Sequence, residues 1–188
     1  ERCIAAVIRG EGESAFRQLL AEIDNPGRWR DIPGFCGVVN DEYVDNGMAS
    51  EIANLDEIPS PYGLPSHNGS TEGSALTGRA PRLRNEQPLN SACGTPTFPG
   101  SKPFMQLETS RGCRNRCAFC TSGASVAVRR FSISRVRSDL ELIRTAGVRH
   151  VRIVDRTFNE NRRRCVELLR MFRTEFSDMD FHLEIDPS

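Results

Sequence analysis

The residues best suited to chemistry are three cysteines, Cys113, Cys117 and Cys120, which stand in the segment ETSRGCRNRCAFC. Thiolates are ligands for zinc and for iron–sulfur clusters. A structural zinc site takes four protein ligands, and a cubane iron–sulfur cluster normally takes four thiolates. The other cysteines are scattered singly, at Cys3, Cys36, Cys93 and Cys165. Three thiolates in one loop therefore predict a metal centre with one open position, which is typical of a catalytic site.

Two neighbours of these cysteines suit a metal-binding loop. Gly112 allows the backbone to pass close to a bulky cluster, because glycine has no Cβ atom. Phe119 is expected to shield sulfur from water. Backbone N–H groups of the loop are expected to donate hydrogen bonds to the cluster and so tune its potential.

The elements that position the loop begin near Lys102, where strand-like and helix-like segments alternate. The strand PFMQLET is expected first, followed by the cysteine loop. Then come a helix over Ser134–Ala146, a strand over Val148–Val154, a helix over Arg162–Phe176 and a strand over Phe181–Ile185. This order is typical of parallel βα units, in which chemistry takes place at the carboxyl ends of the strands. The cysteine loop, Asp155 and Glu184 all lie at or near such ends.

The first part of the chain predicts a smaller α/β unit. A buried strand is expected over Cys3–Arg9, then the turn GEGE and an amphipathic helix over Glu13–Ile23. The apolar residues of that helix share one face: Phe16, Leu19, Leu20 and Ile23. A short hairpin is expected in IPGFCGVVNDE, and an extended segment in LDEIPSPYG, where two prolines restrict the backbone.

A stretch rich in Gly, Ser, Pro, Thr and Asn separates these two parts. Such a composition favours a linker or a surface loop over residues 63–100. The expected division is therefore a first domain at 1–62, this linker, and a second domain at 101–188. Both ends of the chain are interpreted as cuts through folded structure, so the chain is read as a fragment.

Composition narrows the class of protein. Of 188 residues, 38% are hydrophobic and 27% charged, which permits a real core. No apolar run approaches the roughly 20 residues of a membrane span, and no secretory signal opens the chain. Seven cysteines without such a signal favour a reducing, cytoplasmic location and metal-binding use.

Charge is unevenly distributed along the chain. Residues 111–173 contain sixteen arginines against five acidic residues, although the net charge of the chain is zero. Such a block could face nucleic acid or another anionic partner. The interpretation we favour is solvated helix faces, and a nucleic-acid partner remains the less favoured alternative.

CRNRCAFC fits the CxxxCxxC motif and resembles the radical SAM superfamily, whose members commonly have an aromatic residue before the last cysteine. GEGE with its helix, LDEIPSPY and LETSRGC resemble the branch with an N-terminal cobalamin-binding domain, and VDRTFNEN and HLEIDP strengthen the match. The resemblance implies an α/β fold: the tail of a Rossmann-like domain, then the first βα units of an incomplete parallel (βα) barrel. Arg114 and Arg156 depart from the pattern, since relatives often have Pro and a second Asp there.

The same resemblance implies an enzyme and its cofactors. Cys113, Cys117 and Cys120 would ligate a [4Fe–4S] cluster whose open iron binds S-adenosyl-L-methionine. An electron from a donor such as flavodoxin or ferredoxin would cleave that molecule to a 5′-deoxyadenosyl radical acting on an unknown substrate. Asp155 and Glu184 would contact S-adenosylmethionine, and cobalamin is a candidate cofactor of the full-length protein. Alternatively, Asp155 is a helix N-cap, with Thr157 or Asn159 as rival caps.

Two other functions remain open. One is an RNA-modifying radical SAM enzyme such as a methylthiotransferase, which the arginine block would suit. The other is a non-catalytic iron–sulfur or zinc-binding module. That module requires a fourth ligand, for which Cys93 or Cys165 would have to approach the loop.

Overall fold

A computed structural model describes residues 6–63, 104–115, 117–120 and 127–187. The chain divides into two compact units, Glu1–Ile58 and Pro59–Ser188. This boundary lies close to the predicted end of the first domain at residue 62. Apart from Gly63, the predicted linker falls outside the described residues. No helix in the described ranges is long and apolar enough to span a membrane.

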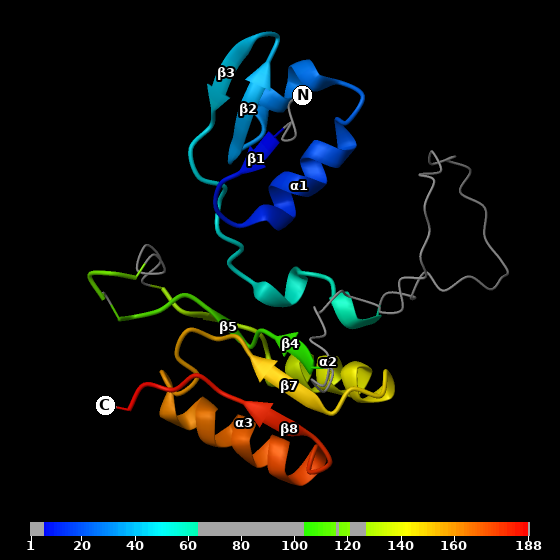
Figure 1. The fold of residues 1–188 in the computed structure, drawn as a ribbon, viewed down its shortest axis with the longest axis vertical. Coiled ribbons are helices and arrows are strands. Elements are labelled where there is room, and N and C mark those ends of the chain that lie inside the picture. Colours follow the sequence, from blue (N-terminus) through cyan, green and yellow to red (C-terminus); the bar gives the residue numbers. More distant parts are fainter. Residues whose placement is uncertain (1–5, 64–103, 116, 121–126, 188) are drawn as a thin grey trace, which may run out of the picture. The chain divides into compact units, whose positions relative to one another are not determined.

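The first unit contains a three-stranded sheet and one helix (Figure 1). Its strands β1, β2 and β3 cover Ala6–Ile8, Phe35–Val39 and Glu42–Asp45, and neighbouring strands are antiparallel. The predicted hairpin is confirmed as β2–β3. Its turn residues Asn40 and Asp41 both have positive φ, 51° and 63°, as a two-residue type I′ turn requires. Mostly parallel α/β sheets often carry antiparallel strands at an edge, so this pairing is compatible with a Rossmann-like domain.

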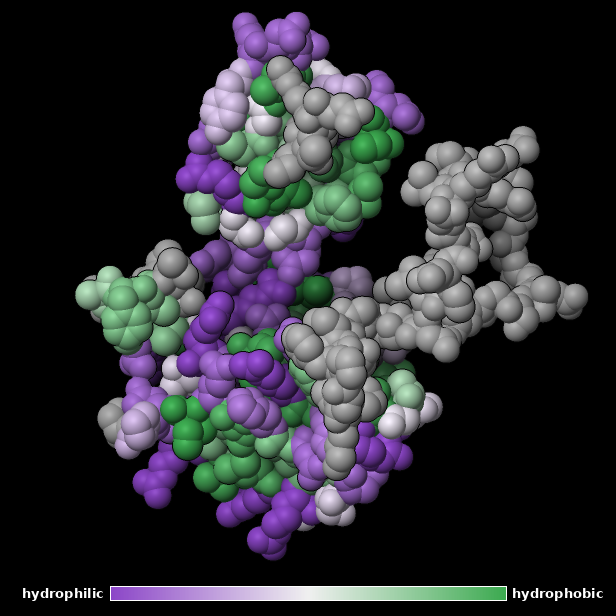
Figure 2. All heavy atoms as spheres, viewed as in Figure 1, coloured by the Kyte–Doolittle hydropathy of each residue, from purple (hydrophilic) through white to green (hydrophobic). Residues whose placement is uncertain are grey.

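Helix α1, at Gly12–Ala21, buries less of its apolar face than the sequence predicted. Ala15 is buried and Leu19 packs against the core that contains Phe35. Phe16 and Leu20 are both 53% exposed. Hydrophobic side chains consequently reach the surface of this unit (Figure 2).

The segment LDEIPSPYG is not extended, so that prediction is wrong. It forms two short 3-10 turns, η2 at Leu55–Glu57 and η3 at Pro61–Gly63. Asn54 starts the first turn, because its side chain accepts a hydrogen bond from the N–H of Asp56 at 3.2 Å. A local side-chain acceptor of this kind favours a turn over an extended backbone.

The second unit confirms the predicted βα order. Its parallel sheet has the order β4-β7-β8, with strands at Phe104–Leu107, His150–Ile153 and Asp180–His182. The predicted helices are α2 at Ile133–Thr145 and α3 at Arg162–Glu175. A two-stranded ladder was not predicted: β5 at Ser110–Arg111 pairs with β6 at Arg129–Arg130.

Side-chain alternation gives the parallel sheet two different faces. Leu107, Val151 and Ile153 are buried, and the helices contribute Leu140 and Phe172 to the same core. Gln106, Arg152 and His182 share a register row and are exposed. One face of the sheet is therefore apolar and covered by helices, and the opposite face is polar.

Candidate functional site

The cysteine loop leaves and re-enters the fold through the β5–β6 ladder. Ser110 pairs with Arg130 and Arg111 with Arg129, so the loop is closed at its base. Gly112 follows directly, with φ of +97°, and a Cβ atom there would collide with the carbonyl oxygen of Ala127. A glycine is required at this position because the two ends of the loop pass so close to one another.

The three cysteines lie in this loop but are not gathered around a common point. Cys113 is half-buried, with its Sγ 3.7 Å from Oγ1 of Thr157. Cys117 and Cys120 are exposed and share a turn, in which the N–H of Cys120 donates to the carbonyl of Cys117 at 3.0 Å. Within the described ranges, no three His, Cys, Asp or Glu side chains are arranged to hold a metal ion. Phe119, expected to shield sulfur, is 91% exposed because it lies in this turn.

The remaining described cysteines lie elsewhere. Cys36 is in β2 of the first unit, where its Sγ lies 2.8 Å from the hydroxyl oxygen of Tyr43. Cys165 is half-buried in α3, and burial raises the pKa of its thiol. Cys3 and Cys93 lie outside the described residues. Nothing in the described part of the chain places Cys165 as a fourth metal ligand.

Asp155 is buried, with 2% of its surface exposed, and its carboxylate accepts four hydrogen bonds. The backbone N–H and hydroxyl of Thr109 donate at 2.7 and 2.5 Å. The backbone N–H and hydroxyl of Ser110 donate at 3.0 and 2.8 Å. The end of β7 is thereby tied to the residues that lead from β4 into the cysteine loop.

The alternative role of Asp155 as a helix cap is wrong. Asn161 is the N-cap of α3, because its side chain accepts the N–H of Arg164 at 3.0 Å. The rival caps Thr157 and Asn159 are wrong for the same reason. Asn159 instead pairs with the backbone of Asp186, at 2.8 and 2.9 Å.

Glu184 lies two residues beyond β8 and belongs to the polar face of the sheet. Its carboxylate accepts a hydrogen bond from Arg152 at 3.1 Å, and both side chains are nearly half exposed. A cavity of about 420 Å³ opens on this face. Its lining comprises Gln106, Glu108, Ser110, Arg111, Gly112, Arg152, Val154, Arg156 and Glu184. The structure therefore does not bring Glu184 and Asp155 together, because Asp155 continues the buried side of β7.

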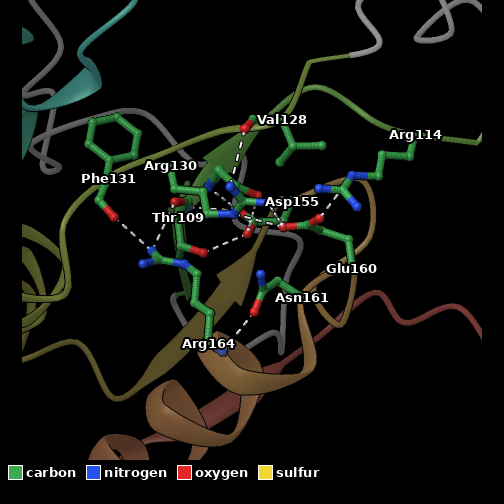
Figure 3. Close-up of polar contacts among 10 residues, drawn as sticks. Thr109, Arg114, Val128, Arg130, Phe131, Asp155, Glu160, Asn161 and Arg164 are labelled. Carbon is green, nitrogen blue, oxygen red and sulfur yellow. Dashed lines mark hydrogen bonds and ion pairs between the residues drawn. The ribbon is translucent and has the colours of Figure 1, made fainter.

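A second carboxylate, which sequence reasoning missed, holds both ends of the loop (Figure 3). Glu160 pairs with Arg130 through two guanidinium nitrogens, one of them at 2.8 Å. Arg114 lies on the other carboxylate oxygen, 3.6 Å away. Nearby, Arg164 donates to the carbonyl oxygens of Phe131 and Thr109, and partial burial lowers the pKa of its guanidinium. The sequence signal that could have indicated this role is that Glu160 is an acidic residue within the arginine block.

Several arginines of the arginine block, residues 111–173, form ion pairs with acidic residues. Ion pairs join Arg135 to Asp139 within α2, and Arg137 of α2 to Glu175 of α3. Others involve acidic residues at its edges, in the pairs Arg111–Glu108, Arg149–Asp178 and Arg152–Glu184. These contacts favour the interpretation of the arginines as helix-surface residues over a nucleic-acid interface.

Several methyltransferases are similar to this chain, although no family model matches it. The uncharacterized methyltransferase PH0819 of Pyrococcus horikoshii is 28% identical over 190 residues, or 95% of this chain and 34% of that protein. The 2-(S-pantetheinyl)-carbapenam-3-carboxylate methyltransferase of Streptantibioticus cattleyicolor is 31% identical over 82% of this chain and 20% of its own. The cobalamin-dependent radical SAM methyltransferase TokK of Streptomyces tokunonensis is 30% identical over the same shares.

A solved structure also matches nearly the whole chain. The radical S-adenosylmethionine methyltransferase TsrM of Kitasatospora setae, with cobalamin and a [4Fe–4S] cluster bound, matches 98% of this chain and 34% of its own length. The TM-score is 0.59 at 17% sequence identity, so this match shows the fold alone. The chain spans about a third or less of the length of these relatives.

The parallel βα units and the cysteine loop form a mixed α/β fold that matches the fold of TsrM. The homologues of this chain include a cobalamin-dependent radical SAM methyltransferase, so the resemblance that the sequence predicted, to the radical SAM branch with cobalamin-binding members, is confirmed. Its relatives are enzymes. The TsrM structure described above has cobalamin and a [4Fe–4S] cluster bound. A second TsrM structure, which matches this chain equally well, has tryptophan substrate and a SAM analogue bound.

Proposed function

We propose that Cys113, Cys117 and Cys120 hold a [4Fe–4S] cluster that binds S-adenosyl-L-methionine, in a protein that acts as a cobalamin-dependent radical SAM methyltransferase. The observation that carries this proposal is the position of the three cysteines. They lie in one loop that follows β4 at its carboxyl end, where α/β enzymes carry out their chemistry. The names of the relatives support methyl transfer as the reaction type.

The residues present fit a cluster of this kind. The donor set is three thiols, which suit iron and leave one metal position open. Cys117 and Cys120 share one turn, which is closed by the hydrogen bond from the N–H of Cys120 to the carbonyl of Cys117. The close approach at Gly112 holds the two ends of the loop together, and Asp155 ties the start of the loop to β7.

The cluster would supply one electron to the sulfonium of S-adenosylmethionine, whose carbon–sulfur bond then breaks to give methionine and a 5′-deoxyadenosyl radical. A low-potential protein such as flavodoxin or ferredoxin would provide that electron. The chain's own residues bind and orient. Glu184, on the polar face of the sheet beside the cavity, would accept a hydrogen bond from the ammonium group of S-adenosylmethionine. Asp155 would act as a positioning residue, because four donors already occupy its carboxylate.

The first unit would belong to the cobalamin-binding part of the full-length protein. GEGE, the helix after it and LDEIPSPY carry this assignment. Residues 1–62 would then be the end of that domain, residues 63–100 a linker, and residues 101–188 the first half of the radical SAM core. The binding site for the acceptor substrate would be formed largely outside the region that this chain matches, since the chain covers about a third of the length of its relatives.

Anaerobic reconstitution with iron and sulfide tests the proposal. We expect about four irons per chain and broad absorption near ~400 nm. Addition of S-adenosylmethionine should change the electron paramagnetic resonance spectrum of the reduced cluster, because its amino and carboxylate groups bind the open iron. Tight binding of one zinc without iron uptake would instead support the non-catalytic module.

A further inference from the structure

Glu160 joins three segments that are far apart in the sequence (Figure 3). It lies in the connection between β7 and α3, and its side chain is only 10% exposed. Arg130, its partner on one oxygen, belongs to β6 at the end of the cysteine loop. Arg114, on the other oxygen, is the residue after Cys113 at the start of the loop. One buried carboxylate thus faces both ends of the segment that carries the three thiols.

The two oxygens of Glu160 are in different situations. Oε1 accepts from two nitrogens of Arg130, a charge-assisted contact of the strong kind. Oε2 is buried and makes no hydrogen bond within the described residues, and it faces the guanidinium of Arg114 at 3.6 Å. A carboxylate oxygen left in this state is costly unless a cation compensates it. Arg114 is that cation, although its own side chain is 65% exposed.

We infer that Glu160 is a positioning residue for the cluster-binding loop and that its charge sets the electrostatic environment of the cluster. This inference rests on the proposed function. Three thiolates around a [4Fe–4S] cluster leave a net negative charge, and one-electron reduction makes that charge larger. Nearby guanidinium groups stabilise the reduced form, and a carboxylate between them offsets part of their effect. Glu160 therefore lowers the reduction potential, which suits a cluster that must reduce a sulfonium.

Two substitutions at Glu160 separate the effect of its negative charge from its effect on the position of the loop. Glu160→Gln keeps the shape and an acceptor oxygen for Arg130 but removes the negative charge. Glu160→Ala removes the contact altogether. Arg114→Gln removes a positive charge on the opposite side of the same contact. The matched controls are Glu167→Gln and Glu167→Ala, at an exposed glutamate on α3.

Redox titration of the reconstituted chain, followed by electron paramagnetic resonance, tests the electrostatic part. Glu160→Gln should move the potential to a more positive value, because two guanidinium groups then remain without their carboxylate. Arg114→Gln should move it to a more negative value, and Glu167→Gln should leave it unchanged. If the contact only held the loop in place, Glu160→Gln and Arg114→Gln would shift the reduction potential in the same direction. Shifts of equal sign, or no shift in Glu160→Gln, would overturn the inference.

Hydrogen exchange on the metal-free chain tests the positioning part. Glu160→Ala should increase exchange at the amides of Arg111 and Arg129, which pair with one another in the β5–β6 ladder. The expected increase is roughly tenfold, the effect of losing about one charge-assisted hydrogen bond. Glu167→Ala should not change them, and unchanged exchange in Glu160→Ala would refute the positioning role. The far-ultraviolet circular dichroism of each variant must match the parent chain. Failure of the parent chain to take up iron would refute the proposed function, while the exchange measurement would still decide whether Glu160 holds the loop.

Discussion

Asp155 accepts two hydrogen bonds from Thr109, one from the backbone N–H at 2.7 Å and one from the hydroxyl at 2.5 Å. The two residues follow neighbouring parallel strands, β7 and β4, and both are buried. A carboxylate in this position takes the place of ladder hydrogen bonds just where the strands end and the cysteine loop begins. The geometry at the base of the cysteine loop therefore depends on Asp155.

Asp155→Asn should destabilise the second unit by about 2–4 kcal/mol, because an amide nitrogen would face N–H and O–H donors in a buried site. The control is Asp178→Asn, which alters a half-exposed carboxylate paired with Arg149. That change should cost less than about 1 kcal/mol. Urea unfolding followed by circular dichroism gives both values. If the two substitutions changed the free energy of unfolding equally, the four hydrogen bonds of Asp155 would stabilise the unit no more than the surface pair of Asp178 does.

Gly112→Ala should destabilise the chain more than Gly147→Ala. Both glycines have positive φ, +97° and +82°, which costs a residue with a side chain about 1–2 kcal/mol. Only at Gly112 would the new Cβ also meet a backbone carbonyl, that of Ala127, whereas nothing lies within 4 Å at Gly147. The difference between the two unfolding free energies measures the close approach at the base of the loop. A difference of zero would mean that the loop can open there without cost.

Replacing Cys113, Cys117 or Cys120 by Ala should abolish the reconstituted cluster, since each thiolate holds one iron. Cys36→Ala and Cys165→Ala should leave the iron content and the absorption spectrum unchanged. Neither of those residues belongs to a group of possible metal ligands within the described residues. Loss of the cluster in Cys165→Ala would indicate ligation by four thiolates and would contradict the open iron.

The acid sensitivity of the chain should depend in part on Glu175. The hydrogen bond from Arg137 lowers the pKa of this carboxyl below its ordinary value of 4.5. A lowered pKa in the folded state adds stability above the ordinary value, and that stability is lost as the pH falls through the folded-state value. The melting temperature of the parent chain should therefore fall more than that of Glu175→Gln between about pH 6 and pH 3. Parallel pH profiles would show that the pair is screened by solvent.

The arginine block should bind transfer RNA only weakly. Several of its arginines pair with acidic residues such as Asp139 and Glu175, so less positive charge is available to phosphates. Fluorescence anisotropy should detect binding at low salt that disappears at about 150 mM salt, because phosphate contacts weaken steeply with ionic strength. Binding that survives this salt concentration would favour the RNA-modifying alternative.

The sequence by itself determined the local elements and the donor set. Helices α2 and α3 were predicted to within about two residues, because their apolar spacing and the glycine at residue 147 are local signals. The order of strands and helices followed from the same periodicity. The spacing of Cys113, Cys117 and Cys120 depends on chain connectivity alone, so the amino-acid sequence is sufficient to show the resemblance to the radical SAM superfamily.

Only the tertiary structure decided which side chains meet. Asp155 and Glu184 both follow strands in the sequence, yet one is buried at the base of the loop and the other lies on the polar face. That difference depends on strand register and on where the helices pack, which no short segment contains. Glu160 was missed for the same reason, since its partners Arg114 and Arg130 are distant in the sequence and reach it only when the loop closes.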